Sequence, residues 1–175
     1  MSRYAAFLRG VNLGKRTVKS AELKATFETL GFTEVKTLLA SGNVLFDARS
    51  EKGLKQKIET GLEAAFGFPI PIVLRSLDEL RAMVAADPFG GVEASDAANL
   101  HVMLFDQPIP AGFTQPAVPG DFDVPMMTER ELFFLVYKKS DGTYLGRSSL
   151  DTEKRLPKGT LVTMRNWNTI LKAIA

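Results

Sequence analysis

The first 75 residues alternate between short apolar runs and helical stripes. Residues 3–9 form an apolar run that ends at a glycine, which indicates a buried strand. Leucine and phenylalanine then recur at helical spacing and predict a helix that starts near Ser20 as N-cap and stops at Gly31. Two further runs, 34–40 and 44–46, are predicted to pair as a β-hairpin around the turn Ser41-Gly42-Asn43.

A second helix and a fourth strand complete this half of the chain. Residues 51–66 place Leu54, Ile58 and Leu62 on one helical face, and residues 72–74 follow as a strand. The order strand, helix, strand, strand, helix, strand is that of the ferredoxin-like split unit, so residues 1–75 are predicted to form one such half.

Residues 76–175 predict a second α+β half of related composition. A helix over 77–86, capped by Ser76 or Asp78, precedes an irregular segment, 106–119, that contains four prolines. A short helix capped by Ser148 or Ser149 is expected to run through Leu156. The predicted strands are 100–105, 122–128, 131–138 and 161–164, and the terminal helix is 170–175. The fold class is therefore α+β, with two ferredoxin-like halves packed as one compact unit; no internal sequence repeat is evident.

Composition narrows the possible chemistry. The 175 residues include no cysteine and one histidine, His101, which excludes thiolate chemistry and argues against a structural zinc site. No signal peptide is evident, and no apolar run approaches the ~20 residues that span a bilayer, so a cytoplasmic location without membrane association is expected. No cofactor or metal is predicted.

Charge is spread unevenly, although the net charge is only +2. Residues 1–20 carry +5, residues 87–136 carry −7, and residues 137–175 carry +5. Two basic ends thus flank an acidic middle. If the ends meet they form a positive patch, and if the acidic segment folds over them the charges cancel.

The strongest candidate for chemistry is the segment after the first strand. It carries Arg9, Asn12, Gly14 and Lys15 with no acid nearby, and glycine turns before a helix expose backbone N–H groups that attract anions. It has neither the Walker nor the dinucleotide spacing of glycines. The alternative is a turn in which Asn12 only bonds its own backbone.

Two other stretches carry polar candidates. Ser41 and Asn43 are explained by the hairpin turn alone, and His101 in a predicted strand is a poor base for a serine nucleophile. Near the end, Arg165, Asn166 and Trp167 either start a helix with a buried indole or form a platform for a phosphate and a base.

Three motifs together resemble one bacterial family, the domain of unknown function 1697. They are Leu8-Arg9-Gly10-Val11-Asn12-Leu13-Gly14-Lys15, Leu39-Ala40-Ser41-Gly42-Asn43-Val44-Leu45-Phe46 and Thr163-Met164-Arg165-Asn166-Trp167-Asn168-Thr169. The resemblance spans nearly the whole chain and implies an α+β fold with ferredoxin-like parts and no established activity. Family members often carry two adjacent glycines where this chain has only Gly14 before Lys15.

Three classes of function fit these features. The first is binding of an anionic partner: a nucleotide, a phosphate-bearing metabolite or a nucleic acid. It would use one cleft shared by Arg9, Asn12, Lys15, Ser41, Asn43 and Arg165. The second is an enzyme acting on a small phosphorylated or carboxylated metabolite, for which no general base is evident. The third is a structural or protein-interaction module. The sequence does not define an oligomeric state.

Overall fold

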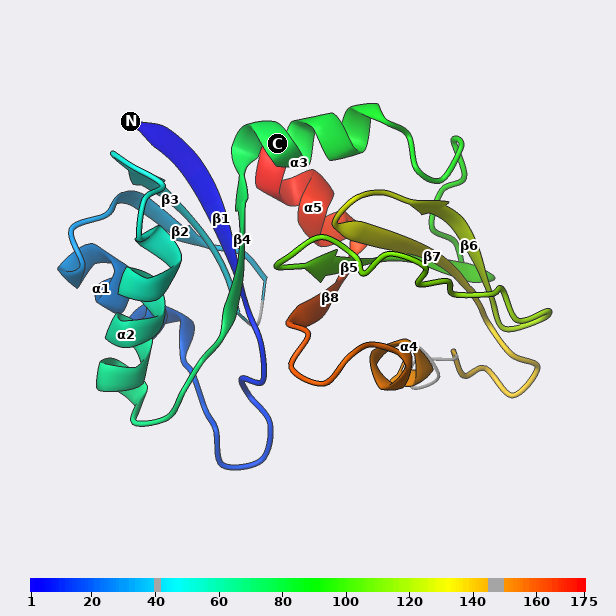
Figure 1. Ribbon diagram of the computed structural model, residues 1–175, viewed down its shortest axis with the longest axis horizontal. Coiled ribbons are helices and arrows are strands. Elements are labelled where there is room, and N and C mark those ends of the chain that lie inside the picture. The colour runs from blue at the N-terminus through cyan, green and yellow to red at the C-terminus, as the bar shows by residue number, and fades with distance from the viewer. Residues whose placement is uncertain (40–41, 145–149) are drawn as a thin grey trace. The chain divides into compact units, whose positions relative to one another are not determined.

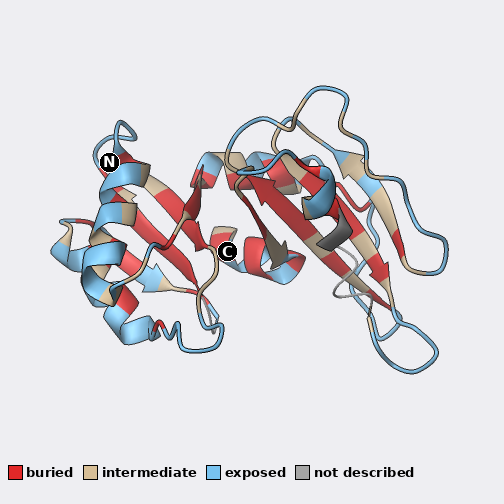
Figure 2. Cartoon of the chain, turned by 60° about the horizontal axis from the view of Figure 1, so that its bottom comes forward, coloured by how far each residue is buried: buried red, intermediate tan, exposed pale blue. Residues whose placement is uncertain are grey.

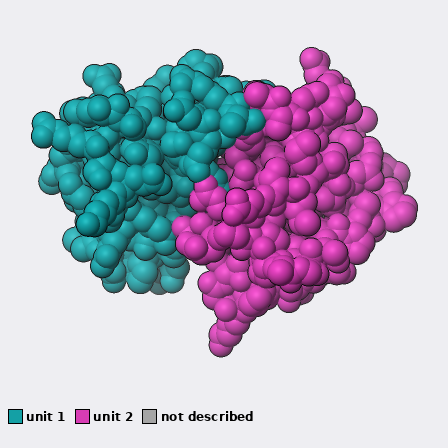
Figure 3. All heavy atoms as spheres, turned by 45° about the horizontal axis from the view of Figure 1, so that its top comes forward, with its two compact units in different colours: residues 1–82, 171–175 teal, residues 83–170 magenta. Residues whose placement is uncertain are grey.

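The computed structural model describes residues 1–39, 42–144 and 150–175. The chain divides into two compact units, coloured separately in Figure 3. Unit 1 comprises Met1–Ala82 and Leu171–Ala175, and unit 2 comprises Met83–Ile170. The division predicted after residue 75 falls one residue before the end of the strand β4 (Ile72–Ser76), whereas the boundary between these units lies within the helix α3 (Leu77–Ala85).

Unit 1 contains the predicted ferredoxin-like order (Figure 1). Its four strands form one antiparallel sheet in the order β2-β3-β1-β4, so the first strand is central and lies beside the third. The elements are β1 (Ser2–Leu8), α1 (Ser20–Thr29), β2 (Thr33–Thr37), β3 (Asn43–Ala48), α2 (Leu54–Phe66), β4 (Ile72–Ser76) and the start of α3 (Leu77–Ala85).

Two helix starts differ from the predictions. Ser20 is not the N-cap of α1: Lys19 is, without a side-chain cap, and its carbonyl accepts the first helical bond, from the N–H of Leu23 at 2.9 Å. Helix α2 begins at Leu54 rather than at residue 51, because Gly53 has the left-handed angle φ 68° and closes a turn before the helix. The Ser76 cap of α3 is confirmed, since Ser76 Oγ accepts from the N–H of Glu79 and the Glu79 carboxylate accepts from the N–H of Ser76.

The core of unit 1 lies between the sheet and helices α1 and α2. Alternate residues of the strands join the apolar stripes of both helices in one buried cluster, and Figure 2 shows the strands mostly red and the loops mostly pale blue. Four aromatic rings meet there, with Phe46 in contact with Tyr4, Phe27 and Phe32. This packing fixes the sheet and therefore the points at which its loops leave it.

Unit 2 has the same sheet topology, with the strand order β6-β7-β5-β8, again all antiparallel. Its crossover between the first two strands is irregular rather than helical, because the prolines of 106–119 cannot sustain a helix. The elements are the end of α3, β5 (Ala98–Phe105), β6 (Phe122–Met127), β7 (Glu131–Tyr137), α4 (Leu150–Arg155), β8 (Val162–Asn166) and most of α5 (Trp167–Ile174).

The start of the last helix is three residues earlier than predicted. Helix α5 begins at Trp167, because Asn166 caps it directly: its Oδ1 accepts from the N–H of Asn168 at 2.9 Å. The predicted caps of α4, Ser148 and Ser149, lie outside the described residues.

The two units repeat one strand register, a repeat that the sequence does not reveal. Ala5 pairs with Arg75 and Leu45, and in unit 2 Val102 pairs with Arg165 and Phe133 in the same way. Even the register shift between the second and third strands recurs, between Thr33 and Lys36 in unit 1 and between Asp123 and Met126 in unit 2. The fold is therefore two α+β halves built on the same strand framework.

Candidate functional site

The segment after β1, residues 9–19, is termed the basic loop. Two backbone bonds anchor its start: the N–H of Leu8 donates to the carbonyl of Gly42 at 2.8 Å, and the N–H of Arg9 donates to the carbonyl of Pro71 at 2.9 Å. The loop thus leaves the sheet between the turn that precedes β3 and the residue that precedes β4. Gly42, directly before β3, and the start of the basic loop therefore lie at the same end of the sheet.

Asn12 holds the middle of the basic loop together. Its backbone N–H donates to the carbonyl of Arg16 at 2.6 Å, and its Oδ1 accepts from the N–H of Val18 at 2.9 Å. Asn12 itself has φ 58°, a left-handed angle that asparagine tolerates better than most residues. The Asn12 side chain therefore braces the loop through its Oδ1 atom, and binding by Asn12 stays a prediction.

The tip of the basic loop is exposed and positively charged. Gly14 and Lys15 lie at the tip, and among the described residues no carboxylate forms an ion pair with Lys15, Arg16 or Lys19. The Arg16 guanidinium lies over the Phe68 ring, 5.5 Å from its centroid, which orients this charge. The loop is thus a braced element with three cations that no acid of the described chain neutralises.

Gly42 lies against Val11 of this loop. Gly42 has φ 71°, and a Cβ added there would lie 3.1 Å from Val11 Cγ2 and 3.2 Å from Leu8 Cβ. The Asn43 side chain is buried and donates from Nδ2 to the carbonyl of Leu38 at 3.1 Å, closing the turn. Ser41 lies outside the described residues. Asn43 therefore has a structural partner, and its part in ligand binding stays a prediction.

The candidates near the end of the chain belong to unit 2. Arg165 donates from Nη1 to Thr163 Oγ1 at 2.6 Å and to the carbonyl of Met164 at 2.9 Å, and burial lowers its pKa to about 10, so it remains charged at neutral pH. Trp167 is 8% exposed and lies edge-on to Phe89 and Phe133. The burial of Trp167 that the sequence predicts is confirmed, whereas ligand binding by Arg165, Asn166 and Trp167 stays a prediction.

Arg165 has a counterpart in unit 1 that sequence reasoning missed. Arg75 occupies the same register position on β4, directly before the capping residue of a helix, and its Nη1 also donates to the preceding carbonyl, that of Leu74, at 3.1 Å. Arg75 is 1% exposed. The parallel between Leu74-Arg75-Ser76 and Met164-Arg165-Asn166 is a signal in the sequence that points to the repeat. Both arginines bond the strand backbone at the same register position.

Three further expectations from the sequence concern His101, metal binding and the membrane. Burial lowers the pKa of His101, which keeps the imidazole neutral at pH 7. Within the described ranges, no group of three or more metal-ligating side chains gathers at one place. No described helix combines the length and the apolar character needed to cross a membrane.

The comparisons with known proteins agree with this architecture. Residues 1–127 match the family described as "Protein of unknown function (DUF1697)", and the chain belongs to that family. No curated protein matches the chain. Among solved structures, the chain is similar to the conserved bacterial protein SP0830 from Streptococcus pneumoniae, with 22% identity and a TM-score of 0.70 over 99% of this chain and 96% of that one. That similarity shows the fold.

Proposed function

We propose that the basic loop of unit 1 binds a phosphate-bearing ligand. The observation that carries the proposal is the braced loop with unneutralised charge at Lys15, Arg16 and Lys19. Like charges held together without a counter-ion disfavour each other, so an anion that bridges them gains binding energy.

The surroundings of the loop add to this positive field. Helix α1 starts directly after Lys19 with no side-chain cap, and its first turn holds one acid, Glu22. The free N–H groups of a helix start carry partial positive charge. The proposal concerns binding and assigns no reaction; ligand binding by Arg165, Asn166 and Trp167 of unit 2 is a separate prediction.

The test is calorimetry with inorganic pyrophosphate, adenosine 5′-monophosphate and a single-stranded oligonucleotide. The double variant Lys15→Gln/Lys19→Gln should weaken binding of the tightest of these about fivefold or more, because one exposed charge contact contributes up to about 1 kcal/mol. The matched control Lys24→Gln/Lys36→Gln makes the same charge change on exposed positions of α1 and β2.

The pattern of binding to the three probes distinguishes a nucleic-acid partner from a small ligand. Binding of all three probes with a steep salt dependence indicates a nucleic-acid partner, and saturable binding of the nucleotide alone indicates a small ligand. The proposal is contradicted if no probe binds at millimolar concentration, or if the control variant weakens binding as much as the loop variant does.

A further inference from the structure

A concave surface of unit 1 lies at the end of the sheet opposite to the basic loop. It is a pocket of about 350 Å³, within the usual size range of small-molecule sites. It lies where β3 ends and α2 begins, and it is lined by Met1, Gly31, Phe32, Thr33, Asp47, Ala48, Arg49, Ser50, Lys52, Leu54 and Lys57.

The pocket is separate from the basic loop. Strands β1 and β3 are antiparallel and Ser2 pairs with Ala48, so the pocket lies at the start of β1 and the loop at its end. The seven residues of β1 extend over about 20 Å, which exceeds the Debye length of ~8 Å at physiological salt. A charge in one site therefore has little effect on the other.

Three cations line this pocket without an acidic partner. Among the described residues, no carboxylate forms an ion pair with Arg49, Lys52 or Lys57. The Lys57 ammonium is held over the Phe32 ring, 5.0 Å from its centroid. Helix α2 begins at the same place with neither a side-chain cap nor an acid in its first turn, so its N-terminus adds positive potential.

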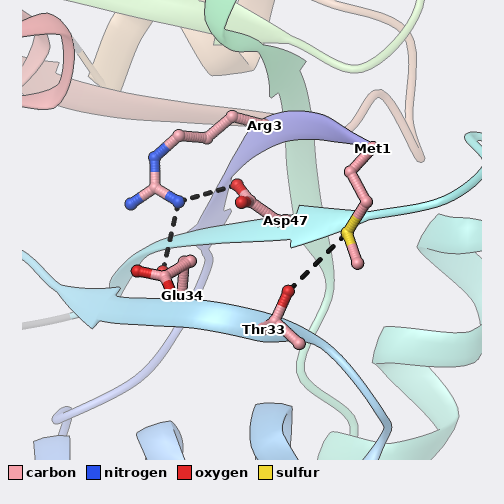
Figure 4. Close-up of polar contacts among 5 residues, drawn as sticks. All are labelled: Met1, Arg3, Thr33, Glu34 and Asp47. Carbon is pink, nitrogen blue, oxygen red and sulfur yellow. Dashed lines mark hydrogen bonds and ion pairs between the residues drawn. The ribbon is translucent and has the colours of Figure 1, made fainter.

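The one acid of the lining is neutralised from outside the pocket. Asp47 accepts from Arg3 Nη1 at 2.8 Å, and the same nitrogen donates to the carbonyl of Glu34 at 3.1 Å. Figure 4 shows the Arg3 guanidinium, which extends from β1, in contact with the Asp47 carboxylate and the Glu34 carbonyl. Glu34 has φ 49° within the register shift of β2, and this irregular backbone presents its carbonyl to Arg3. The three cations of the pocket therefore keep their positive potential.

We infer that this pocket is a second binding site, specific for a small organic phosphate. The cations supply the recognition of the phosphate group. The apolar part of the lining, Phe32, Ala48 and Leu54, supplies contact for a compact apolar portion of the ligand, and the volume excludes a polymer. Nothing in this site depends on the basic loop, so the two sites succeed or fail independently.

The experiment is an amide NMR titration of the full chain with phenyl phosphate. The amides of Phe32, Ser50 and Leu54 should shift in a saturable way. Arg49→Ala should weaken this binding up to about fivefold, and Lys52→Ala similarly, because each removes one exposed charge contact. Both side chains are exposed, so both variants should keep the wild-type spectrum elsewhere.

Two controls make the result decisive. Lys24→Ala removes an exposed charge outside the pocket and should leave the affinity unchanged, and Lys15→Gln, in the basic loop, should do the same. The inference is overturned if no saturable shift occurs at these amides up to millimolar ligand, if Arg49→Ala and Lys52→Ala bind as the wild type does, or if Lys15→Gln abolishes the shifts.

Discussion

The first crossover of unit 1 and the first crossover of unit 2 leave the same strand framework at the same point. Leu8 and Arg9 donate to Gly42 and Pro71, and in unit 2 Phe105 and Asp106 donate in the same way to Arg130 and Leu161, at 2.9 and 3.1 Å. The framework of hydrogen bonds is thus common to both units.

Beyond these bonds the two crossovers differ in charge and in shape. Residues 9–19 carry four bases and no acid and lead into α1, whereas residues 106–121 carry two acids and no base and contain four prolines. The strand framework does not need a basic loop, because unit 2 keeps the framework without one. This difference is the reason for assigning ligand binding to the unit 1 loop rather than to the fold.

The largest expected effect comes from the residues that start the two equivalent helices. Trp167 and Leu77 occupy matching positions after β8 and β4, and both are buried. Trp167→Ala should cost ~3–5 kcal/mol of unfolding free energy and Leu77→Ala about 2, since the indole contacts two further rings. Urea unfolding followed by far-UV circular dichroism measures both, and a smaller loss for Trp167→Ala than for Leu77→Ala would contradict this packing.

A smaller effect is expected at the turn before β3. Gly42→Ala should cost about 1–3 kcal/mol, because its Cβ would crowd Val11 and Leu8 at a left-handed φ. Arg130, whose carbonyl accepts the equivalent bond in unit 2, is not at a positive φ, and Arg130→Ala should cost less. Equal losses of melting temperature in the two variants would remove this distinction between the units.

The brace of the basic loop predicts an effect of about 1 kcal/mol. Asn12→Ala removes the acceptor of the Val18 N–H and should speed hydrogen exchange at that amide about fivefold. Asn12→Asp keeps an acceptor oxygen and should preserve the protection. If the Val18 amide exchanges equally fast in wild type and Asn12→Ala, Asn12 does not brace the loop.

The smallest predicted effect is on the pH dependence of stability. His101 is the only histidine, and burial lowers its pKa below the usual value of 6.5. The unfolded state therefore binds a proton first as the pH falls, so the free energy of unfolding should decrease on going below about pH 6.5. His101→Gln should reduce the change in the free energy of unfolding between pH 7 and 5.5, measured by urea unfolding. If the variant shows the same change as the wild type, other groups cause the pH dependence.

Local patterns of the sequence predicted the helices and strands. The repeat of the strand register could not be predicted from them, because it depends on contacts between residues far apart in the sequence. Apolar runs such as Tyr4 to Leu8 and helical periods such as Leu54, Ile58 and Leu62 placed six elements of unit 1 in the ferredoxin-like order. The repeat was not predicted, because equivalent positions of the two units, such as Ala5 and Val102, share a register but not a residue type.

For the candidate site, the sequence left two roles open at Asn12 and Asn43: ligand binding, or a bond to the backbone of their own turn. The structure shows the backbone bonds, and the choice depended on φ angles that composition does not reveal. The pocket beside α2 was missed because its lining comes from segments far apart in the sequence, and no motif joins Phe32 to Arg49 and Lys57.

The central claim is that equivalent crossovers of the two units differ in anion binding. The most direct measurement is an amide NMR titration of the full chain with inorganic pyrophosphate, read at both crossovers. We expect saturable shifts at Gly14 and Lys15 in the basic loop and none at Gly112 and Phe113 in the acidic crossover. Shifts of the same size in both crossovers, or none in the basic loop, would contradict the claim.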